Sequence, residues 1–359
     1  MLSLCQHGYE ALLERELVAA GLAVTGKGSG WVLCGSELAR DLSDPSRASS
    51  LPQIDPESLA FPQLTLLGER EFTGESVNAL AQQLADFFLE SLRGERIEAA
   101  WPCVFSMVPE VVGLGRRSTG VEKAFLELLK KKLSRIAKLA QPDAPRTSGK
   151  VRGLFVFFAD FGKVYASREA WLGGQRRMAD DDAAPSRSYL KVEEAYIVLG
   201  REPQAGETVV DLGAAPGGWS YSAAKRGAHV IAVDNGPLKG GALNNPAIEH
   251  RLEDAFKFAP SFAKAVEGTA PVRETYDWLF CDLVEEPHHV MRNIVTPWLS
   301  GGWCRRFVIN LKFGHVDALA LLREIRAADS PYVQYVTGLR IRHLYHDREE
   351  FTVVGELKA

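Results

Sequence analysis

The residues best suited to hold a cofactor lie in one glycine-rich segment, Asp211-Leu212-Gly213-Ala214-Ala215-Pro216-Gly217-Gly218. Glycines let a backbone approach a ligand without a Cβ in the way. The spacing differs from the dinucleotide pattern G-x-G-x-x-G, and Pro216 lacks the N–H donor that a pyrophosphate requires. The segment therefore favours an uncharged stretch of cofactor, as in S-adenosylmethionine, which carries no phosphate. A tight strand-to-helix turn without a ligand is the alternative.

Two carboxylates further along the chain support a cofactor site. Asp234 follows an apolar strand about 20 residues after the turn, where an acid can accept hydrogen bonds from ribose hydroxyls. Asp254, after the next connection, could bind the adenine amino group. Each of the two is alternatively a solvated loop acid.

The elements that must position these residues form a regular alternation of strands and helices from about Glu193 onward. Short apolar runs separated by helices or long connections are typical of a doubly wound α/β sheet with buried strands. The expected strands are 208–212, 229–233, 276–281, 306–311 and 351–355, with a helix running from the glycine-rich turn to about residue 226.

The N-terminal half has a different, mixed order that indicates small α+β modules. Apolar residues at helical or alternating spacing define its elements. We expect helices over 8–22, 77–92 and 120–139, strands over 31–34, 63–67, 104–108, 152–158 and 163–167, and a linker or long surface loop over 41–57.

Composition limits the classes of protein to which the chain can belong. No apolar run approaches the roughly 18 residues that span a bilayer, and the N-terminus lacks the features of a secretory signal. The five cysteines are odd in number and widely spaced, which favours reduced thiols over disulfides or a zinc site. We therefore expect a cytoplasmic protein with no membrane partner and no metal.

The charge distribution suggests a nucleic-acid partner. The whole chain carries −4, yet Arg116 to Lys191 contains 17 Lys and Arg against 8 Asp and Glu, a local +9. A basic segment of this kind attracts a phosphate backbone, although solvated faces of ordinary helices are an equal alternative. We expect Lys130, Lys131, Lys132, Arg176 and Arg177 to contact phosphates, which gives affinity rather than sequence readout.

Several motifs together resemble the FtsJ-like 2′-O-ribose methyltransferases. DLGAAPGGWS resembles their first cofactor motif, and Ser186 to Lys191 (SRSYLK) resembles their S-R-x-x-x-K signature. CDLVEEP, NLKFG and DREEFTVV are similar to the segments with their remaining catalytic residues, so the resemblance covers residues 180–359. It implies a Rossmann-like fold, S-adenosylmethionine as cofactor, and Ser188 together with residues 215–218 lining the cofactor pocket.

The whole chain also resembles a branch of this family that methylates one cytidine of 23S ribosomal RNA. SRSYLKVEEA, VDNGP, WCRRFVINLK and LYHDREE carry that resemblance, and GYEALLERELVAAGL extends it more weakly to the N-terminal half. It implies a ferredoxin-like module over residues 1–50, a THUMP RNA-binding domain over 51–170 and a catalytic domain over 180–359. We expect the protein to act as a monomer.

The family resemblance also implies a catalytic tetrad of Lys191, Asp282, Lys312 and Glu350. A ribose hydroxyl is a poor nucleophile and must lose its proton as it attacks a methyl group. Lys312, directly after an apolar strand, is the expected base, and Asp282 could also contact the cofactor. The Lys191 cation and burial would lower the pKa of Lys312, whereas the two acids oppose that lowering. Glu349 is the rival of Glu350 for the fourth place.

Other functions are less consistent with the sequence. Exocyclic amino methylation usually uses an Asn/Asp-Pro-Pro-Tyr or Phe motif, which is absent, and carbon-5 methylation needs a cysteine nucleophile, for which neither Cys103 nor Cys281 is well placed. A nicotinamide dehydrogenase is disfavoured by Pro216. A non-catalytic RNA-binding or ribosome-assembly protein with a methyltransferase fold, or a methyltransferase acting on another RNA, remains as the alternative.

Overall fold

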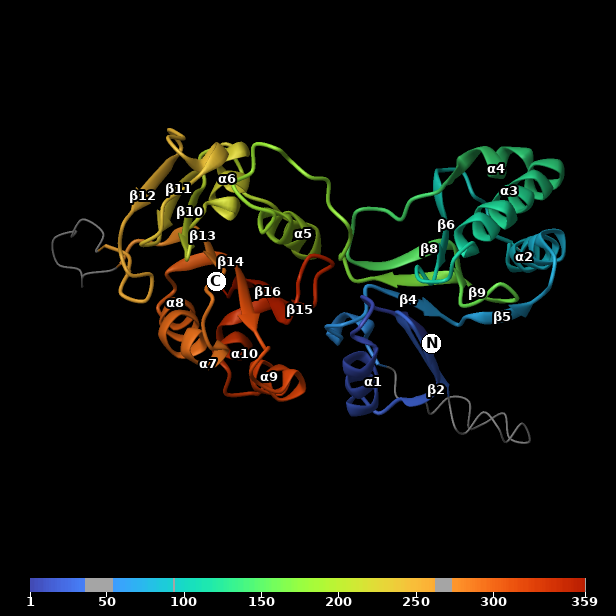
Figure 1. Cartoon of the computed structure of the whole chain (residues 1–359), viewed down its shortest axis with the longest axis horizontal. Coiled ribbons are helices and arrows are strands. Elements are labelled where there is room, and N and C mark those ends of the chain that lie inside the picture. Colours follow the sequence, from blue (N-terminus) through green and yellow to red (C-terminus); the bar gives the residue numbers. More distant parts are fainter. Residues whose placement is uncertain (36–53, 93, 262–272, 359) are drawn as a thin grey trace. The chain divides into compact units, whose positions relative to one another are not determined.

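The computed structural model describes residues 1–35, 54–92, 94–261 and 273–358 (Figure 1). The chain forms two compact units. The N-terminal unit comprises Met1–Glu57 and Phe61–Gly173, and the C-terminal unit comprises Ser58–Ala60 and Gly174–Ala359. The linker expected over 41–57 lies mostly outside the described residues and stays a prediction.

The N-terminal unit is built on one sheet with strand order β2-β3-β1-β4-β9-β8-β6-β7, and β5 pairs with β9. Its strands are β1 (Leu2–Leu4), β2 (Ala23–Gly28), β3 (Trp31–Gly35), β4 (Leu64–Leu67), β5 (Arg70–Thr73), β6 (Trp101–Met107), β7 (Ala140–Gln141), β8 (Gly149–Phe158) and β9 (Lys163–Leu172). Its helices are α1 (Glu10–Ala19), α2 (Val77–Ser91), α3 (Leu114–Lys132) and α4 (Ser134–Leu139).

Helices α2 and α3 show why these segments are helical. The hydroxyl of Ser76 caps α2 by accepting a hydrogen bond from the Ala79 N–H. The apolar residues of α2 and α3, among them Phe88 and Phe125, recur at helical spacing and are buried in one core with the strands. The single helix expected over 120–139 is wrong. The chain leaves helical geometry at Leu133, and no glycine or proline marks the break.

One sheet joins the two modules that were expected in the N-terminal half. Strand β1 pairs antiparallel with β3 on one side and with β4 on the other, at Leu2↔Leu33 and Leu2↔Leu66. Residues on both sides of the expected 50/51 boundary therefore share backbone hydrogen bonds. The division into a ferredoxin-like module and a THUMP domain stays a prediction.

The C-terminal unit has a seven-stranded sheet with order β12-β11-β10-β13-β14-β16-β15. Its strands are β10 (Thr208–Leu212), β11 (His229–Val233), β12 (Ile248–Arg251), β13 (Tyr276–Cys281), β14 (Cys304–Lys312), β15 (Val336–Arg342) and β16 (Glu350–Leu357). Its α-helices are α5 (Tyr189–Leu199), α6 (Gly218–Lys225), α7 (Pro287–Val290), α8 (Thr296–Ser300), α9 (Ala318–Ile325) and α10 (Pro331–Tyr335), with a π-helical turn at Met291–Val295 and a 3₁₀ turn at Gly240–Ala242.

The strand directions complete a Rossmann-like fold. Strands β10 to β14 pair in parallel, and β16 runs antiparallel to both β14 and β15. The strand order reverses between β10 and β13, and the crevice at the carboxyl ends of two such strands is where ligands bind in open α/β sheets. The doubly wound sheet expected from the sequence is confirmed.

Helices α5 and α6 are held against the C-terminal sheet by large apolar side chains. Tyr196 of α5 and Trp219 of α6 are buried with Trp278 and Phe280 of β13. Burial of each such side chain stabilises the fold by roughly 1.5–3 kcal/mol, so both helices are held against the sheet. Trp219 therefore packs in the core.

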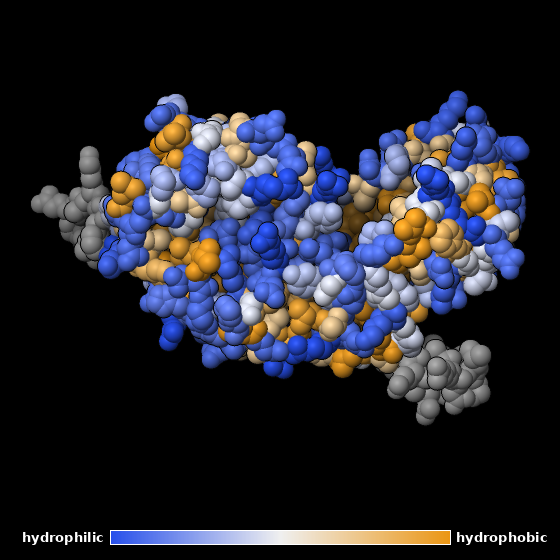
Figure 2. Space-filling view, viewed as in Figure 1, coloured by the Kyte–Doolittle hydropathy of each residue, from blue (hydrophilic) through white to orange (hydrophobic). Residues whose placement is uncertain are grey.

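Hydrophilic residues predominate on the face of the molecule seen in Figure 2, with hydrophobic residues in smaller patches. Large exposed apolar side chains are nevertheless present, and Val112 and Val284 are 94% and 84% exposed. Among the described residues, no helix combines the length and the apolar character that a membrane span requires.

Candidate active site

The glycine-rich turn connects β10 to α6 at the point where the strand order reverses. Gly213 and Gly217 have φ values of +81° and +106°, in the left-handed region that favours glycine. A Cβ on Gly213 would lie 2.7 Å from the Leu283 side chain, and one on Gly217 would lie 2.5 Å from the Cβ of Ala242. The turn therefore requires glycine for its conformation and for its close contacts.

Asp234 and Ser188 lie against this turn. The carboxylate of Asp234 accepts hydrogen bonds from the N–H groups of Ala215, at 3.0 Å, and Gly236, at 2.7 Å. Each carboxylate oxygen has a further lone pair for a ligand hydroxyl. A Cβ on Gly218 would lie 3.1 Å from the Ser188 hydroxyl, and the Ser188 carbonyl accepts a hydrogen bond from the Trp219 indole. Ser188 thus borders the turn from α5.

Asp254 contacts residues that follow it closely in the sequence. Its carboxylate accepts a hydrogen bond from the Phe256 N–H and lies 3.4 Å from the Lys257 ammonium group. These contacts leave its expected role with adenine a prediction.

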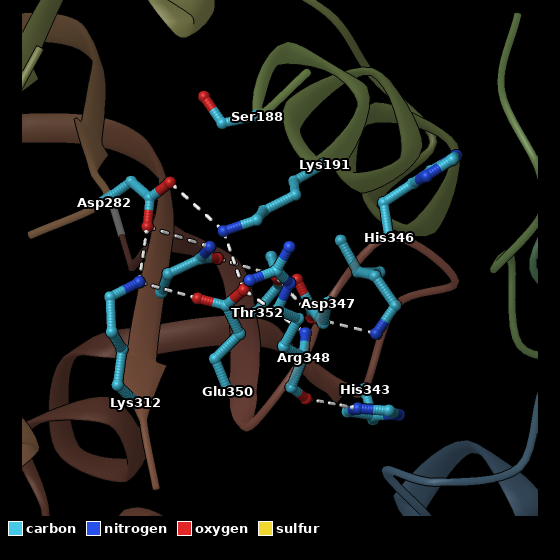
Figure 3. A network of polar contacts seen from close by, with 12 residues as sticks. Ser188, Lys191, Asp282, Lys312, His343, His346, Asp347, Arg348, Glu350 and Thr352 are labelled. Atoms are coloured by element: carbon cyan, nitrogen blue, oxygen red, sulfur yellow. Dashed lines mark hydrogen bonds and ion pairs between the residues drawn. The ribbon is translucent and has the colours of Figure 1, made fainter. Parts of the chain in front are cut away.

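Lys191, Asp282, Lys312 and Glu350 form a closed ring of ion pairs (Figure 3). The Lys191 Nζ lies 3.3 Å from Asp282 Oδ2 and 2.7 Å from Glu350 Oε1. The Lys312 Nζ lies 3.0 Å from Asp282 Oδ1 and 2.7 Å from Glu350 Oε2. Each carboxylate bridges both amines, so the two positive and two negative charges compensate one another.

The sheet explains why these four side chains converge. Asp282 directly follows β13 and Lys312 ends β14, and because these strands are parallel neighbours their carboxyl ends lie side by side. Glu350 opens β16 and pairs in register with Lys312 across the antiparallel ladder. Lys191 reaches the same place from the first turn of α5.

Register also separates the two rival glutamates. Glu349 lies just before β16 and Glu350 is the first residue of that strand. Glu350 is buried and contacts both of them. Glu349 is exposed, and its carbonyl accepts a hydrogen bond from the Phe313 N–H.

The electrostatic balance in the ring favours the charged form of both lysines. Burial alone would lower the pKa of Lys312, but the charges of Asp282 and Glu350 outweigh burial and raise that pKa above its ordinary value. The same opposition raises the pKa of Lys191. Burial pushes the pKa of Asp282 upward, but the two lysines outweigh it and lower the pKa overall. The sequence left open whether the two acids or the opposing effects would dominate the pKa of Lys312, and in the structure the acids do.

A cavity of about 730 Å³ opens onto this ring. Lys191, Lys312 and Glu350 line it together with Ser188, and Arg187 and Arg348 add two guanidinium groups to its wall. Neither the turn residues 215–218 nor Asp234 belong to its lining. The amines are therefore reached from a space large enough for a nucleotide-sized group, and Ser188 lies between this space and the glycine-rich turn.

Three polar residues behind the ring were missed by the sequence analysis. Asn310, Asp347 and Thr352 are each 1% exposed and connect to Asp282 through hydrogen bonds. In the sequence these residues could have been found from Asn310, a polar residue within the otherwise apolar end of β14. Among the described residues, no group of His, Cys, Asp and Glu is arranged to hold a metal ion.

The five basic residues expected to contact RNA fall in both units. Lys130, Lys131 and Lys132 are exposed in the last turn of α3, where Lys132 lies 3.5 Å from Asp86. Arg177 is exposed and Arg176 is half-buried in the segment before α5. Their role stays a prediction.

Comparison with known proteins gives one family match and many relatives. The model of the FtsJ-like methyltransferase family matches residues 184–297. The chain is 35% identical over 98% of its length to Ribosomal RNA large subunit methyltransferase M of Alkalilimnicola ehrlichii, covering 92% of that protein. It is 40% identical to the protein of the same name from Marinomonas sp., over 54% of this chain and 55% of that one.

Similarity to solved structures is weaker. TrmN from Thermus thermophilus is 15% identical, and the match covers 99% of each chain with a TM-score of 0.35. A similarity this low carries no functional argument.

Proposed function

This chain belongs to the family of Ribosomal RNA large subunit methyltransferase M, and from that premise we propose that it transfers a methyl group from S-adenosylmethionine to a ribose 2′-hydroxyl of a cytidine in 23S ribosomal RNA. The observation that carries the proposal is the closed ring of Lys191, Asp282, Lys312 and Glu350 at the carboxyl ends of β13 and β14.

The chemistry of the glycine-rich turn fits this cofactor. Gly213 and Gly217 keep the backbone clear of Cβ atoms, and Asp234 offers carboxylate oxygens to ribose hydroxyls. In this proposal the cofactor is held by Ser188, Ala215, Pro216, Gly217, Gly218, Asp234, Asp254 and Asp282. When bound, S-adenosylmethionine supplies a methyl group on a positively charged sulfur, and that charge opposes protonation of a nearby lysine.

Lys312 acts in this proposal as the general base. In its neutral form it would take the proton of the 2′-hydroxyl as the ribose oxygen bonds to the methyl carbon. The sulfur–methyl bond would break at the same time, and its electron pair would stay on the sulfur, which leaves as a neutral thioether. The resulting ammonium is stabilised by the two carboxylates that already lie 2.7 and 3.0 Å from Nζ. Lys191 holds the other oxygen of each acid and thereby fixes their orientation.

RNA binding involves both units in this proposal. Residues 1–50 form a ferredoxin-like module and residues 51–170 a THUMP domain that contacts RNA, while residues 180–359 carry out catalysis. Lys130, Lys131, Lys132, Arg176 and Arg177 bind phosphates. Such an enzyme acts in the cytoplasm, where ribosomal RNA is available.

A methyl-transfer assay tests the proposed function. With labelled S-adenosylmethionine and 23S RNA that lacks the modification, the wild-type protein should label one cytidine ribose, and Lys312→Ala should lose at least about 100-fold in kcat. Lys225→Ala, an exposed lysine of α6 that pairs with Asp181, is the matched control and should keep wild-type activity. Label on a base, or undiminished activity in Lys312→Ala, would contradict the mechanism. A wild-type protein that binds RNA without transferring methyl groups would instead indicate a non-catalytic role.

A further inference from the structure

A chain of buried polar side chains runs from Asp282 into the interior behind the ring (Figure 3). The Asn310 amide nitrogen lies 3.3 Å from Asp282 Oδ1. The Thr352 hydroxyl lies 2.7 Å from Asn310 Oδ1 and 3.0 and 3.3 Å from the two oxygens of Asp347. Asp347 also accepts a hydrogen bond from the Leu344 N–H at 2.9 Å. Asp347 is buried, and among the described residues no lysine lies within ion-pair distance of it. In this it differs from Asp282 and Glu350, which both pair with Lys191.

The ionised state of Asp282 fixes the direction of the hydrogen bonds along this series of side chains. An ionised carboxylate can only accept, so Asn310 must present its NH₂ group to Asp282 and its carbonyl oxygen to Thr352. The opposite orientation of the amide would bring two acceptor oxygens together. The charge of Asp282 therefore fixes the orientation of Asn310.

Counting protons then determines the state of Asp347. The Thr352 hydroxyl has a single hydrogen, and its shortest contact, 2.7 Å, is to the Asn310 carbonyl oxygen. With that hydrogen on the shorter contact, Thr352 presents only lone pairs to Asp347. Two acceptors at 3.0 Å would repel each other, whereas a protonated Asp347 would donate the hydrogen bond that this contact needs.

The surroundings of Asp347 favour the neutral acid as well. Burial is the main cause that raises its pKa well above the ordinary value, and the charge of Glu350 adds to it. Lys191 and the hydrogen bond from Leu344 act in the opposite direction, and Glu194 acts in the same direction as Glu350. The effects that disfavour the ionised form of Asp347 are the stronger ones, so its pKa is raised overall.

We propose that Asp347 is a positioning residue that works as a neutral carboxylic acid, donating through Thr352 and Asn310 to hold Asp282 in place. The proposal rests on the proposed methyl transfer and deepens it. A third anion at this position would strengthen the hold on the Lys191 and Lys312 protons and so oppose the use of Lys312 as a base. A neutral Asp347 supplies the hydrogen bond without that charge.

Two pairs of variants test the proposal. Asp347→Asn keeps a donor for Thr352 and an acceptor for Leu344, so it should retain kcat within about threefold, whereas Asp347→Ala should lose at least about tenfold in kcat with little change in KM for RNA. Likewise Thr352→Ser should retain activity and Thr352→Val should not. The double variant Asp347→Ala/Thr352→Val should lose no more than either single variant, because both break the same chain.

A spectroscopic measurement makes the test independent of activity. Burial also raises the pKa of Glu194 to about 8 and that of Asp211 to about 7, so the readout is a difference between two proteins. The infrared carbonyl absorption of protonated carboxylic acids at pH 7 should be weaker in Asp347→Asn than in the wild-type protein, by the contribution of one group. Active wild-type enzyme with an inactive Asp347→Asn, or an acid band of equal strength in the two proteins, would overturn this proposal and leave the proposed function standing. Absence of methyl transfer in the wild-type protein would overturn the proposed function, while the infrared band would still report the state of Asp347.

Discussion

At Lys312 two opposite electrostatic effects act on one amine. Burial disfavours the ammonium, and the carboxylates of Asp282 and Glu350 favour it more strongly, so the pKa of Lys312 is raised. A base must be neutral before it can take a proton. The pairing that holds Lys312 in place therefore also limits the fraction of enzyme that is ready to react.

This limit predicts the pH dependence of methyl transfer. Because the pKa of Lys312 lies above the ordinary value of about 10.4, the neutral fraction and hence kcat should rise with pH throughout the range from about 6 to 9. In Asp282→Asn one of the raising charges is gone, so the pKa of Lys312 falls and the rise should shift to lower pH, even though the maximal rate is smaller. Single-turnover rates across this range provide the measurement. A wild-type rate that is already constant from pH 6 upward would contradict the role of Lys312.

At the scale of elements, the strand-to-helix turn between β10 and α6 combines unusual backbone angles with close packing. Gly217 has φ +106°, and its missing Cβ leaves the space that Ala242 occupies. Asp234, at the end of β11, binds the backbone of the same turn. The shape of the proposed cofactor site thus depends on two neighbouring strands and on the 3₁₀ turn at Gly240–Ala242.

Gly217→Ala should accordingly abolish measurable S-adenosylmethionine binding in calorimetry and destabilise the C-terminal unit by about 2–4 kcal/mol, through backbone strain and overpacking. Gly302→Ala is the matched control. Gly302 also has a positive φ, +63°, but a Cβ there would meet no atom within 4 Å. It should cost about 1 kcal/mol of stability and leave cofactor affinity unchanged. Equal effects of the two substitutions on cofactor affinity would show that the close approach at Gly217 is irrelevant.

At the scale of the whole molecule, charge is distributed unevenly along an acidic chain. The segment from Arg116 to Lys191 carries +9, while the remainder carries −13. It contains part of the N-terminal unit and the beginning of the C-terminal unit, including Lys191 of the ring. The proposed RNA contacts thus lie in the same stretch of chain as one of the proposed catalytic residues.

Reversal of Lys130, Lys131 and Lys132 to Glu should weaken RNA binding and reduce the slope of log K against log salt concentration by about 2–3, since each phosphate contact contributes about 0.7–0.9 to that slope. The control reverses three exposed basic residues of the same unit outside the basic segment, Arg15, Lys27 and Arg70. Titrations of a 23S RNA fragment at several salt concentrations give both slopes. If the control variant lost as much affinity and slope as the test variant, net charge rather than a phosphate contact at α3 would be responsible.

Local sequence determined which residues stand at the ends of strands. An apolar run followed by a polar residue is a signal within a few positions of the chain, which is why β10, β13 and β14, the glycine-rich turn, Asp282 and Lys312 could all be predicted. The family resemblance added Lys191 and Glu350. The end of α3 at Leu133 has no such local mark, and there the prediction was wrong.

Only the tertiary structure decided how these residues meet. Strand order and register bring Lys312 opposite Glu350 rather than Glu349, and the balance of charges around Lys312 depends on atoms separated by 30 and 38 positions in the chain. The hydrogen-bond chain through Asn310, Thr352 and Asp347 likewise exists only once two strands and a loop are packed together. Distances between residues far apart in the chain are set by packing, and hydrogen bonding and pKa values depend on those distances.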